Sequence, residues 1–141
     1  MNAYARSADA YLAQRVLGTS PEQQAALLME AGQKFLGMAI MAMERKDHLE
    51  TARCLSRVTE IIVQADLRLN HAEGGELVEN LKKIYAWWTQ DILKASSTRD
   101  TAKLATVSQH MGEIRQAWEQ LHEKQARSVQ TSEFLLTNRV V

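Results

Sequence analysis

Residues 27–43 are apolar on two faces of one predicted helix, and this feature constrains the fold more than any other part of the chain. At about 100° per residue, one set of side chains forms a stripe of the kind that faces inward in a helical bundle: Leu28, Ala31, Phe35, Met38 and Ala42. A second stripe, about 110° away, consists of Met29, Leu36, Ile40 and Met43. A small domain buries one such stripe readily. The second therefore needs cover from elsewhere in the chain or from a partner.

Methionine is the commonest large residue of this helix, with four copies at Met29, Met38, Met41 and Met43. Because the methionine side chain is unbranched and flexible, a surface built from it adapts to ligands of imperfect fit. The pattern thus favours a groove that accepts a peptide. The alternative is a central helix that its own neighbours cover completely, and the helix alone does not decide between the two.

The length and charge of the chain exclude several classes of protein. Its 141 residues suffice for one domain with a substantial core. Lysine plus arginine and aspartate plus glutamate number 17 each, so there is no basic excess of the kind that nucleic acids or anionic membranes attract. The single cysteine, Cys54, fits a reducing cytosol. With neither a secretory signal nor a membrane-spanning segment predicted, we expect a cytosolic protein without membrane insertion.

Each of four predicted helices begins at a recognisable start signal. The signals are Ser20 with Gln23, Asp47 with Glu50, the pair Gly74-Gly75, and Asp100. Serine and aspartate caps accept hydrogen bonds from the first free backbone N–H groups, and glycine pairs interrupt helices. The first helix is expected to run to about residue 45.

One apolar stripe follows each of the later start signals. The stripes are Leu55, Val58, Ile62, Ala65 and Leu69; then Leu77, Leu81, Ile84, Trp88, Ile92 and Ala95; and finally Leu104, Val107, Met111, Ile114, Trp118 and Leu121. Short connections between such helices predict an all-α fold, an antiparallel four-helix bundle over residues 20–125. Residues 1–19 form an N-terminal arm, and residues 126–141 form a C-terminal tail that is disordered or a short docked helix.

One pair of residues has the spacing of metal ligands. Glu119 and His122 match the Glu-x-x-His spacing of di-iron bundles, which need a second such pair and two further glutamates. None of the other three histidines has a glutamate three positions before it. We therefore interpret the pair as a chance match on a solvated helical turn, with His122 alternatively a satisfied residue at the bundle edge. No metal site is predicted.

The remaining reactive residue types suggest structural roles. Cys54 is expected to be a small buried hydrophobic residue, and Asp66 a satisfied carboxylate at the edge of the bundle. No phosphate-binding loop or activated nucleophile stands out. The sequence predicts no catalytic residue, no cofactor and no enzymatic activity.

Two adjacent tryptophans lie on different faces of the third predicted helix. Trp88 belongs to the inward stripe, whereas Trp87 lies about 100° away. Tryptophan is a frequent anchor at protein interfaces, so Trp87 is a candidate binding residue. The alternative is that the arm, the tail or a loop covers it.

Several blocks, in order along residues 11–120, resemble the flagellar secretion chaperones (the FliS family). They are Tyr11, Val16-Leu17-Gly18-Thr19-Ser20-Pro21-Glu22, Leu28-Met29-Glu30-Ala31-Gly32, Phe35-Leu36, Glu73-Gly74-Gly75-Glu76-Leu77, Asn80-Leu81, Ile84-Tyr85, and Val107, Ile114 and Trp118. The resemblance implies a helical bundle that binds the disordered C-terminal segment of flagellin in the cytosol. Binding would prevent premature polymerisation and keep flagellin competent for flagellar type III export.

This implied function agrees with the surplus of apolar surface, which suits the capture of a helix in a groove. The predicted partner-binding residues are Tyr11, Val16, Met29, Leu36, Ile40, Met43, Tyr85 and Trp87. The flagellar export apparatus is a further candidate partner, and the sequence leaves open a homodimer of the free protein. The arm is predicted to cover the groove until a client displaces it, or alternatively to contact the client directly. A bundle adaptor that binds a folded partner is the runner-up function, and a metal-dependent bundle enzyme is a weaker third.

Overall fold

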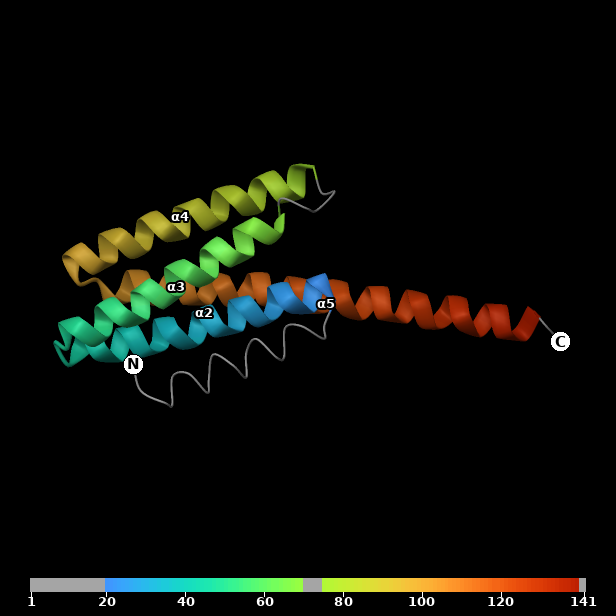
Figure 1. The fold of residues 1–141 in the computed structure, drawn as a ribbon, viewed down its shortest axis with the longest axis horizontal. Coiled ribbons are helices and arrows are strands. Elements are labelled where there is room, and N and C mark those ends of the chain that lie inside the picture. The colour runs from blue at the N-terminus through green and yellow to red at the C-terminus, as the bar shows by residue number, and fades with distance from the viewer. Residues whose placement is uncertain (1–19, 70–74, 140–141) are drawn as a thin grey trace. The chain divides into compact units, whose positions relative to one another are not determined.

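The computed structural model describes residues 20–69 and 75–139, which form four α-helices and no strand (Figure 1). The helices are α2 (Pro21–Glu44), α3 (His48–Leu69), α4 (Glu76–Thr98) and α5 (Thr101–Arg139). Consecutive helices run in opposite directions. The prediction of an all-α four-helix bundle is confirmed. The predicted arm lies outside the described residues.

The chain divides into two compact units. The larger unit, residues 28–114, holds most of α2, all of α3 and α4, and the first part of α5. The described part of the smaller unit consists of residues 20–27 and 115–139. Apart from Ala26, the described buried hydrophobic residues belong to the larger unit.

The helix starts follow the predicted capping signals. The backbone N–H of Gln23 donates to Oγ of Ser20 (3.1 Å), and the backbone N–H of Ser20 donates to Oε1 of Gln23 (3.1 Å). This reciprocal pair is a capping box. Asp47 accepts from the N–H of Glu50 through Oδ1 (3.1 Å), so α3 begins as predicted. Asp100 does the same for α5, with the N–H of Lys103 as donor (3.0 Å).

The α4 helix begins and ends at residues with positive φ. Gly75 precedes it with φ 49°, and no side chain caps this end. Glu76 and Glu79 place carboxylates in the first turn, where they interact favourably with the helix dipole. At the other end Arg99 adopts a left-handed conformation (φ 56°), and the N–H of Asp100 donates to the carbonyl of Ala95 (3.0 Å). The reversal into α5 therefore takes two residues.

The core contains the apolar stripes predicted for α3, α4 and α5. Its most completely buried large side chains are Met29, Leu36, Val58, Trp88, Leu104, Val107 and Met111. The departures lie on α4 and α5. On α4, Leu77 in the first turn is exposed and Ile84 is only partly buried. On α5, burial declines after Met111, so that Ile114, Trp118 and Leu121 are only partly covered.

Both apolar stripes of α2 contribute to the core, since Leu28, Ala31 and Ala42 of the stripe expected to face inward are buried. Met29 and Leu36 are fully buried and Met43 nearly so, which means that the chain itself covers the second stripe. Met38, expected to face inward, is 40% exposed, and the prediction is wrong at this residue. Both stripes are apolar, so periodicity alone does not define the rotation of this helix about its axis.

Two glycines allow α2 and α5 to approach each other closely. A Cβ atom on Gly32 would lie 2.7 Å from Sδ of Met111, and a Cβ on Gly112 would lie 2.7 Å from Nε2 of Gln33. The Gln33 amide nitrogen instead donates to the carbonyl oxygen of Ser108 (3.0 Å). A hydrogen bond between α2 and α5 thus accompanies the close packing.

The residues predicted as a C-terminal tail continue α5. The helix does not end at residue 125 but extends to Arg139, and the exposed side chains along this stretch include Val129, Leu135 and Leu136. Among the described helices, α2 alone is long and apolar enough to cross a membrane, and half of its most apolar window is buried inside the protein.

Candidate functional site

The structure separates the predicted partner-binding residues into three groups. Tyr11 and Val16 lie outside the described residues. Met29, Leu36, Met43 and Tyr85 are buried, and Ile40 is partly buried. Among the six described residues of the set, only Trp87 is exposed, with 60% of its surface accessible. Within the part of the chain that the structure describes, Trp87 is therefore the predicted residue that a partner can reach directly.

Trp87 and Trp88 occupy the faces that helical periodicity predicts. Trp88 is 2% exposed, and Tyr85 is equally buried. The centroids of their rings lie 5.3 Å apart, with an interplanar angle of 36°. Tilted contacts of this kind stabilise aromatic pairs beyond the burial of area. Trp87 points away from this cluster. The predicted phase of α4 is confirmed.

A cavity of about 280 Å³ opens beside Trp87, between α4 and α5. Its apolar lining comes from Ile84 and the two tryptophans on α4, and from Ile114 on α5. We call this cavity the Trp87 pocket. Cavities that bind whole small molecules commonly start at about 300 Å³, so the Trp87 pocket has the dimensions for one or two side chains.

Polar groups from both helices lie at the Trp87 pocket. Asp91 follows Trp87 by one turn of α4, and His110 and Glu113 lie one turn apart on α5. No ion pair joins Asp91 or Glu113 to another described residue. Since no Lys or Arg belongs to the lining, the pocket combines an apolar interior with a net negative rim.

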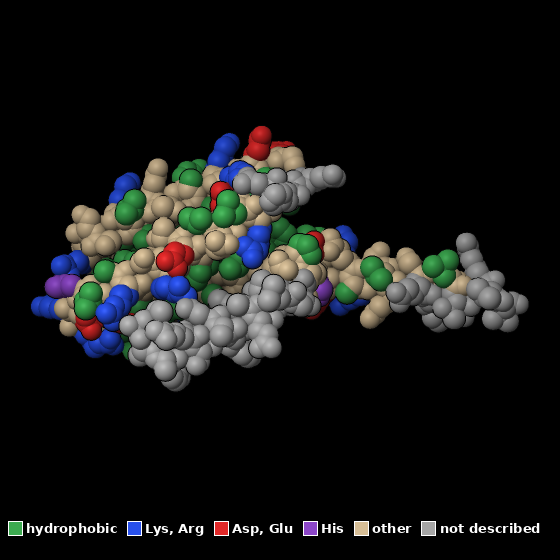
Figure 2. All heavy atoms as spheres, in the orientation of Figure 1, with side chains coloured by type: hydrophobic (Ala, Val, Ile, Leu, Met, Phe, Trp, Pro, Cys, Tyr) green, Lys and Arg blue, Asp and Glu red, His purple; other side chains and the backbone are tan. Residues whose placement is uncertain are grey.

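Other exposed hydrophobic residues are spread over several helices. On the face drawn in Figure 2, hydrophobic side chains lie among polar ones along the helices instead of forming one broad patch. The exposed residues on α2, α3 and α4 besides Trp87 are Met38, Met41, Leu49, Val63, Leu67, Leu77 and Leu93. Single exposed residues of this kind are normal on protein surfaces and need no ligand. Trp87 differs from them because it adjoins a cavity.

The Glu119 and His122 pair is engaged in other contacts. Oε1 of Glu119 accepts from Nε of Arg115 (3.0 Å), and Nδ1 of His122 lies 2.9 Å from Oγ of Ser20. The described residues contain no group of three or more His, Cys, Asp or Glu side chains that could hold a metal ion. Both side chains therefore have structural contacts in place of metal ligation.

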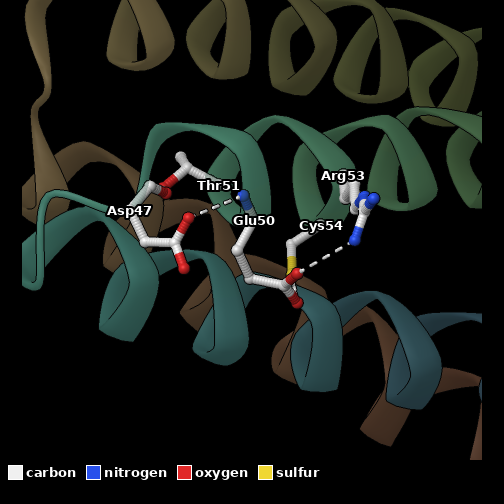
Figure 3. A network of polar contacts seen from close by, with 5 residues as sticks. All are labelled: Asp47, Glu50, Thr51, Arg53 and Cys54. Atoms are coloured by element: carbon white, nitrogen blue, oxygen red, sulfur yellow. Dashed lines mark hydrogen bonds and ion pairs between the residues drawn. The ribbon is translucent and has the colours of Figure 1, made fainter.

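Cys54 is buried in the first turns of α3, as predicted. Figure 3 shows its thiol facing Glu50, to whose Oε1 it donates a weak hydrogen bond (3.5 Å), while Arg53 approaches the other carboxylate oxygen (4.0 Å). Burial, together with the adjacent Glu50 carboxylate, raises the pKa of the Cys54 thiol to about 11. A thiol that stays protonated is a poor nucleophile.

Asp66 is a satisfied carboxylate at the edge of the bundle, as predicted. Its Oδ1 lies 3.4 Å from Nζ of Lys82 and links α3 to α4. Both side chains are more than one third exposed, so the pair contributes little to stability.

Comparison with known proteins places the chain in a family. The family model described as "Flagellar protein FliS" matches residues 3–125. The chain belongs to the FliS family. The match ends a few residues beyond the blocks that carry the resemblance, whereas α5 continues to Arg139.

Curated relatives agree with this assignment. Flagellar secretion chaperone FliSB of Pseudomonas aeruginosa is 30% identical over 105 residues, which cover 74% of this chain and 83% of that protein. Flagellar secretion chaperone FliS of Salmonella typhimurium is 26% identical over 110 residues, covering 77% and 82% of the two chains. The protein of the same name from Vibrio cholerae is 26% identical over 102 residues, covering 72% and 75%. The family expected from the sequence blocks is confirmed.

Sequence reasoning did not identify the α5 side of the Trp87 pocket. His110 and Glu113 are exposed polar residues on a helix whose inward stripe was correctly assigned, and nothing local marks them. Their proximity to Trp87 depends on the register between α4 and α5.

Proposed function

We propose that this protein is a cytosolic export chaperone that binds the disordered C-terminal segment of flagellin. Binding would prevent premature polymerisation and keep flagellin competent for flagellar type III export. Membership of the FliS family carries this proposal, and the names of the relatives support it. We assign no catalytic role and no cofactor to the protein, and the flagellar export apparatus is a further proposed partner.

The exposed indole of Trp87 is the most direct support from the structure. A tryptophan that is 60% exposed beside a cavity resembles the anchors that dominate the energetics of protein interfaces. The client would become ordered on binding, so that loss of chain entropy offsets part of the gain from apolar contact. We therefore expect moderate affinity with a large gain of helical structure in the client.

The buried residues of the predicted set are not directly accessible to a client. Met29, Leu36 and Met43 on α2 are in the core, and a client reaches them only if neighbouring segments move. Their role as binding residues remains a proposal, as does that of Ile40, Tyr85, Tyr11 and Val16. The Trp87 pocket needs no such movement.

Titration calorimetry of the full chain with a flagellin C-terminal peptide tests the proposal. We expect saturable one-to-one binding, with helical circular dichroism that exceeds the sum of the separate components. Trp87→Ala should weaken binding several-fold, whereas Leu93→Ala, an equally exposed site on α4, should not. Absence of binding by the wild-type chain, together with capture of a folded partner, would favour the adaptor function instead.

A further inference from the structure

We propose that the Trp87 pocket binds an arginine or lysine side chain of a client peptide whose neighbouring residues are apolar. The inference rests on the proposed chaperone function and specifies the chemistry that the client presents at this point. Its support is the combination of an exposed indole, an apolar cavity and two carboxylates without ion-pair partners among the described residues.

The interior of the Trp87 pocket suits the stem of a long side chain. Ile84 and Ile114 provide aliphatic surface on α4 and α5, and the buried Trp88 also belongs to the lining. A volume of about 280 Å³ exceeds what a single methyl or isopropyl group fills. Arginine and lysine bury three or four methylene groups along apolar surface while the charged end stays near water.

The rim of the pocket supplies the interactions for a cationic end. Asp91 and Glu113 come from α4 and α5, so a side chain between the helices meets a carboxylate on each side. Neither carboxylate is paired with a described Lys or Arg, in contrast to Asp66 and Glu119, which have cationic partners. A cation entering here therefore need not displace an existing ion pair.

Trp87 adds an attraction that an uncharged side chain lacks. The face of an indole ring attracts a cation within about 6 Å of its centre, and tryptophan is the best of the aromatic residues in this respect. The planar guanidinium group also stacks on the ring and hydrogen-bonds to carboxylates through two nitrogens. We expect arginine to bind more tightly than lysine for this reason.

The charge of the whole protein does not account for such a preference. Acidic and basic residues balance at 17 each, so the protein as a whole does not attract cationic peptides. Discrimination in favour of a basic residue must arise locally. If long-range charge attraction caused the preference, neutralising acidic residues far from the pocket would also weaken it.

The test uses four pentapeptides of sequence Gly-Leu-X-Leu-Gly, blocked at both ends, in which X is Arg, Gln, Glu or Leu. Binding is followed by NMR through the indole N–H signal of Trp87 and the imidazole signals of His110, which lies at the pocket. We expect the Arg peptide to bind about five- to tenfold more tightly than the Gln peptide, with the preference weakening at high salt. The Glu peptide should not shift these signals.

Matched variants test whether the preference for the Arg peptide arises at the Trp87 pocket. Asp91→Asn combined with Glu113→Gln, and separately Trp87→Ala, should abolish most of the preference for Arg over Gln. Glu44→Gln combined with Glu79→Gln changes the net charge equally at two exposed positions away from the Trp87 pocket, and should leave the preference unchanged. Thermal unfolding of each double variant verifies that both remain folded.

Several outcomes would overturn the inference. Equal binding of the Leu and Arg peptides would identify an apolar occupant, and shifts that depend on protein concentration without peptide would identify a second copy of the chain. Loss of the preference in the Glu44/Glu79 control would identify non-specific charge attraction. Calorimetry with the flagellin peptide is interpreted separately: binding of flagellin without an Arg preference refutes the pocket chemistry alone, whereas failure of wild-type to bind flagellin refutes the proposed function.

Discussion

Oγ of Ser20 lies 2.9 Å from Nδ1 of His122, 102 positions further along the chain. The Ser20 hydroxyl oxygen already accepts the N–H of Gln23, so its own hydrogen is available for donation to the ring. Close by, the amide nitrogen of Gln125, in the orientation that satisfies its surroundings, donates to the Glu22 carboxylate (3.2 Å). The residues that cap the start of α2 thus also contact α5.

Removing the Ser20 hydroxyl should destabilise the protein by about 1–2 kcal/mol, because Ser20→Ala loses both the cap and the contact with the ring. His122→Ala removes the contact but leaves the capping box. A double-mutant cycle on urea unfolding should yield a coupling of about 0.5–1.5 kcal/mol between the two residues. Strict additivity would mean that the hydrogen bond contributes nothing to stability.

The adjacent tryptophans of α4 should respond oppositely to truncation. Trp88→Ala creates a cavity in the core and should cost on the order of 3–5 kcal/mol in the free energy of unfolding. Trp87→Ala should leave the melting temperature almost unchanged and weaken binding of the flagellin peptide. Chemical denaturation and calorimetry measure the two effects, and similar destabilisation by both changes would contradict the assignment.

Alkaline pH should weaken the fold through Cys54. The thiol pKa is about 11 in the folded protein, against 9.0 for an unperturbed thiol. From about pH 9 the unfolded state therefore binds fewer protons than the folded state, so the free energy of unfolding falls as pH rises toward 11. Urea unfolding at pH 7.5, 9 and 10.5 should show a steeper decline for wild-type than for Cys54→Ala. Parallel declines would show that the thiol is not the group responsible.

Glu119 and His122 should bind no metal. Both already have protein partners, Arg115 and Ser20, in the structure. Elemental analysis of protein purified without added metal should find no stoichiometric iron, manganese or zinc, for wild-type and Glu119→Ala alike. One metal ion per chain that disappears in the variant would refute this.

Much of the fold follows from local signals that act within a few residues. Ser20, Asp47 and Asp100 cap their helices as predicted because a cap needs only its own first turn. The stripe of α3 and the phase of Trp87 and Trp88 were predicted correctly because each of these helices has one regular apolar stripe, although single hydrophobic residues such as Val63 and Leu93 are exposed elsewhere on them.

The errors occur where the answer depends on other helices. The rotation of α2 was ambiguous because both of its stripes are apolar, and the structure exposes Met38 while it buries Met29. Leu77 continues a perfect stripe yet is exposed, since periodicity indicates the side of a helix and not whether a neighbour covers it. The Trp87 pocket was missed for the same reason, because His110 and Glu113 reach it only through the register of α5 against α4.

The 39-residue α5 helix, about 58 Å long, has a consequence for how the protein opens. Leu104, Val107 and Met111 anchor its beginning in the core, whereas Val129, Leu135 and Leu136 near its end are exposed. An isolated helical stretch with little tertiary contact is marginal in water. Amide hydrogen exchange should therefore accelerate steadily toward Arg139, with the last turns opening independently of global unfolding. A partner that covered these turns would slow their exchange first, so the end of α5 is a local reporter of association even where overall stability does not change.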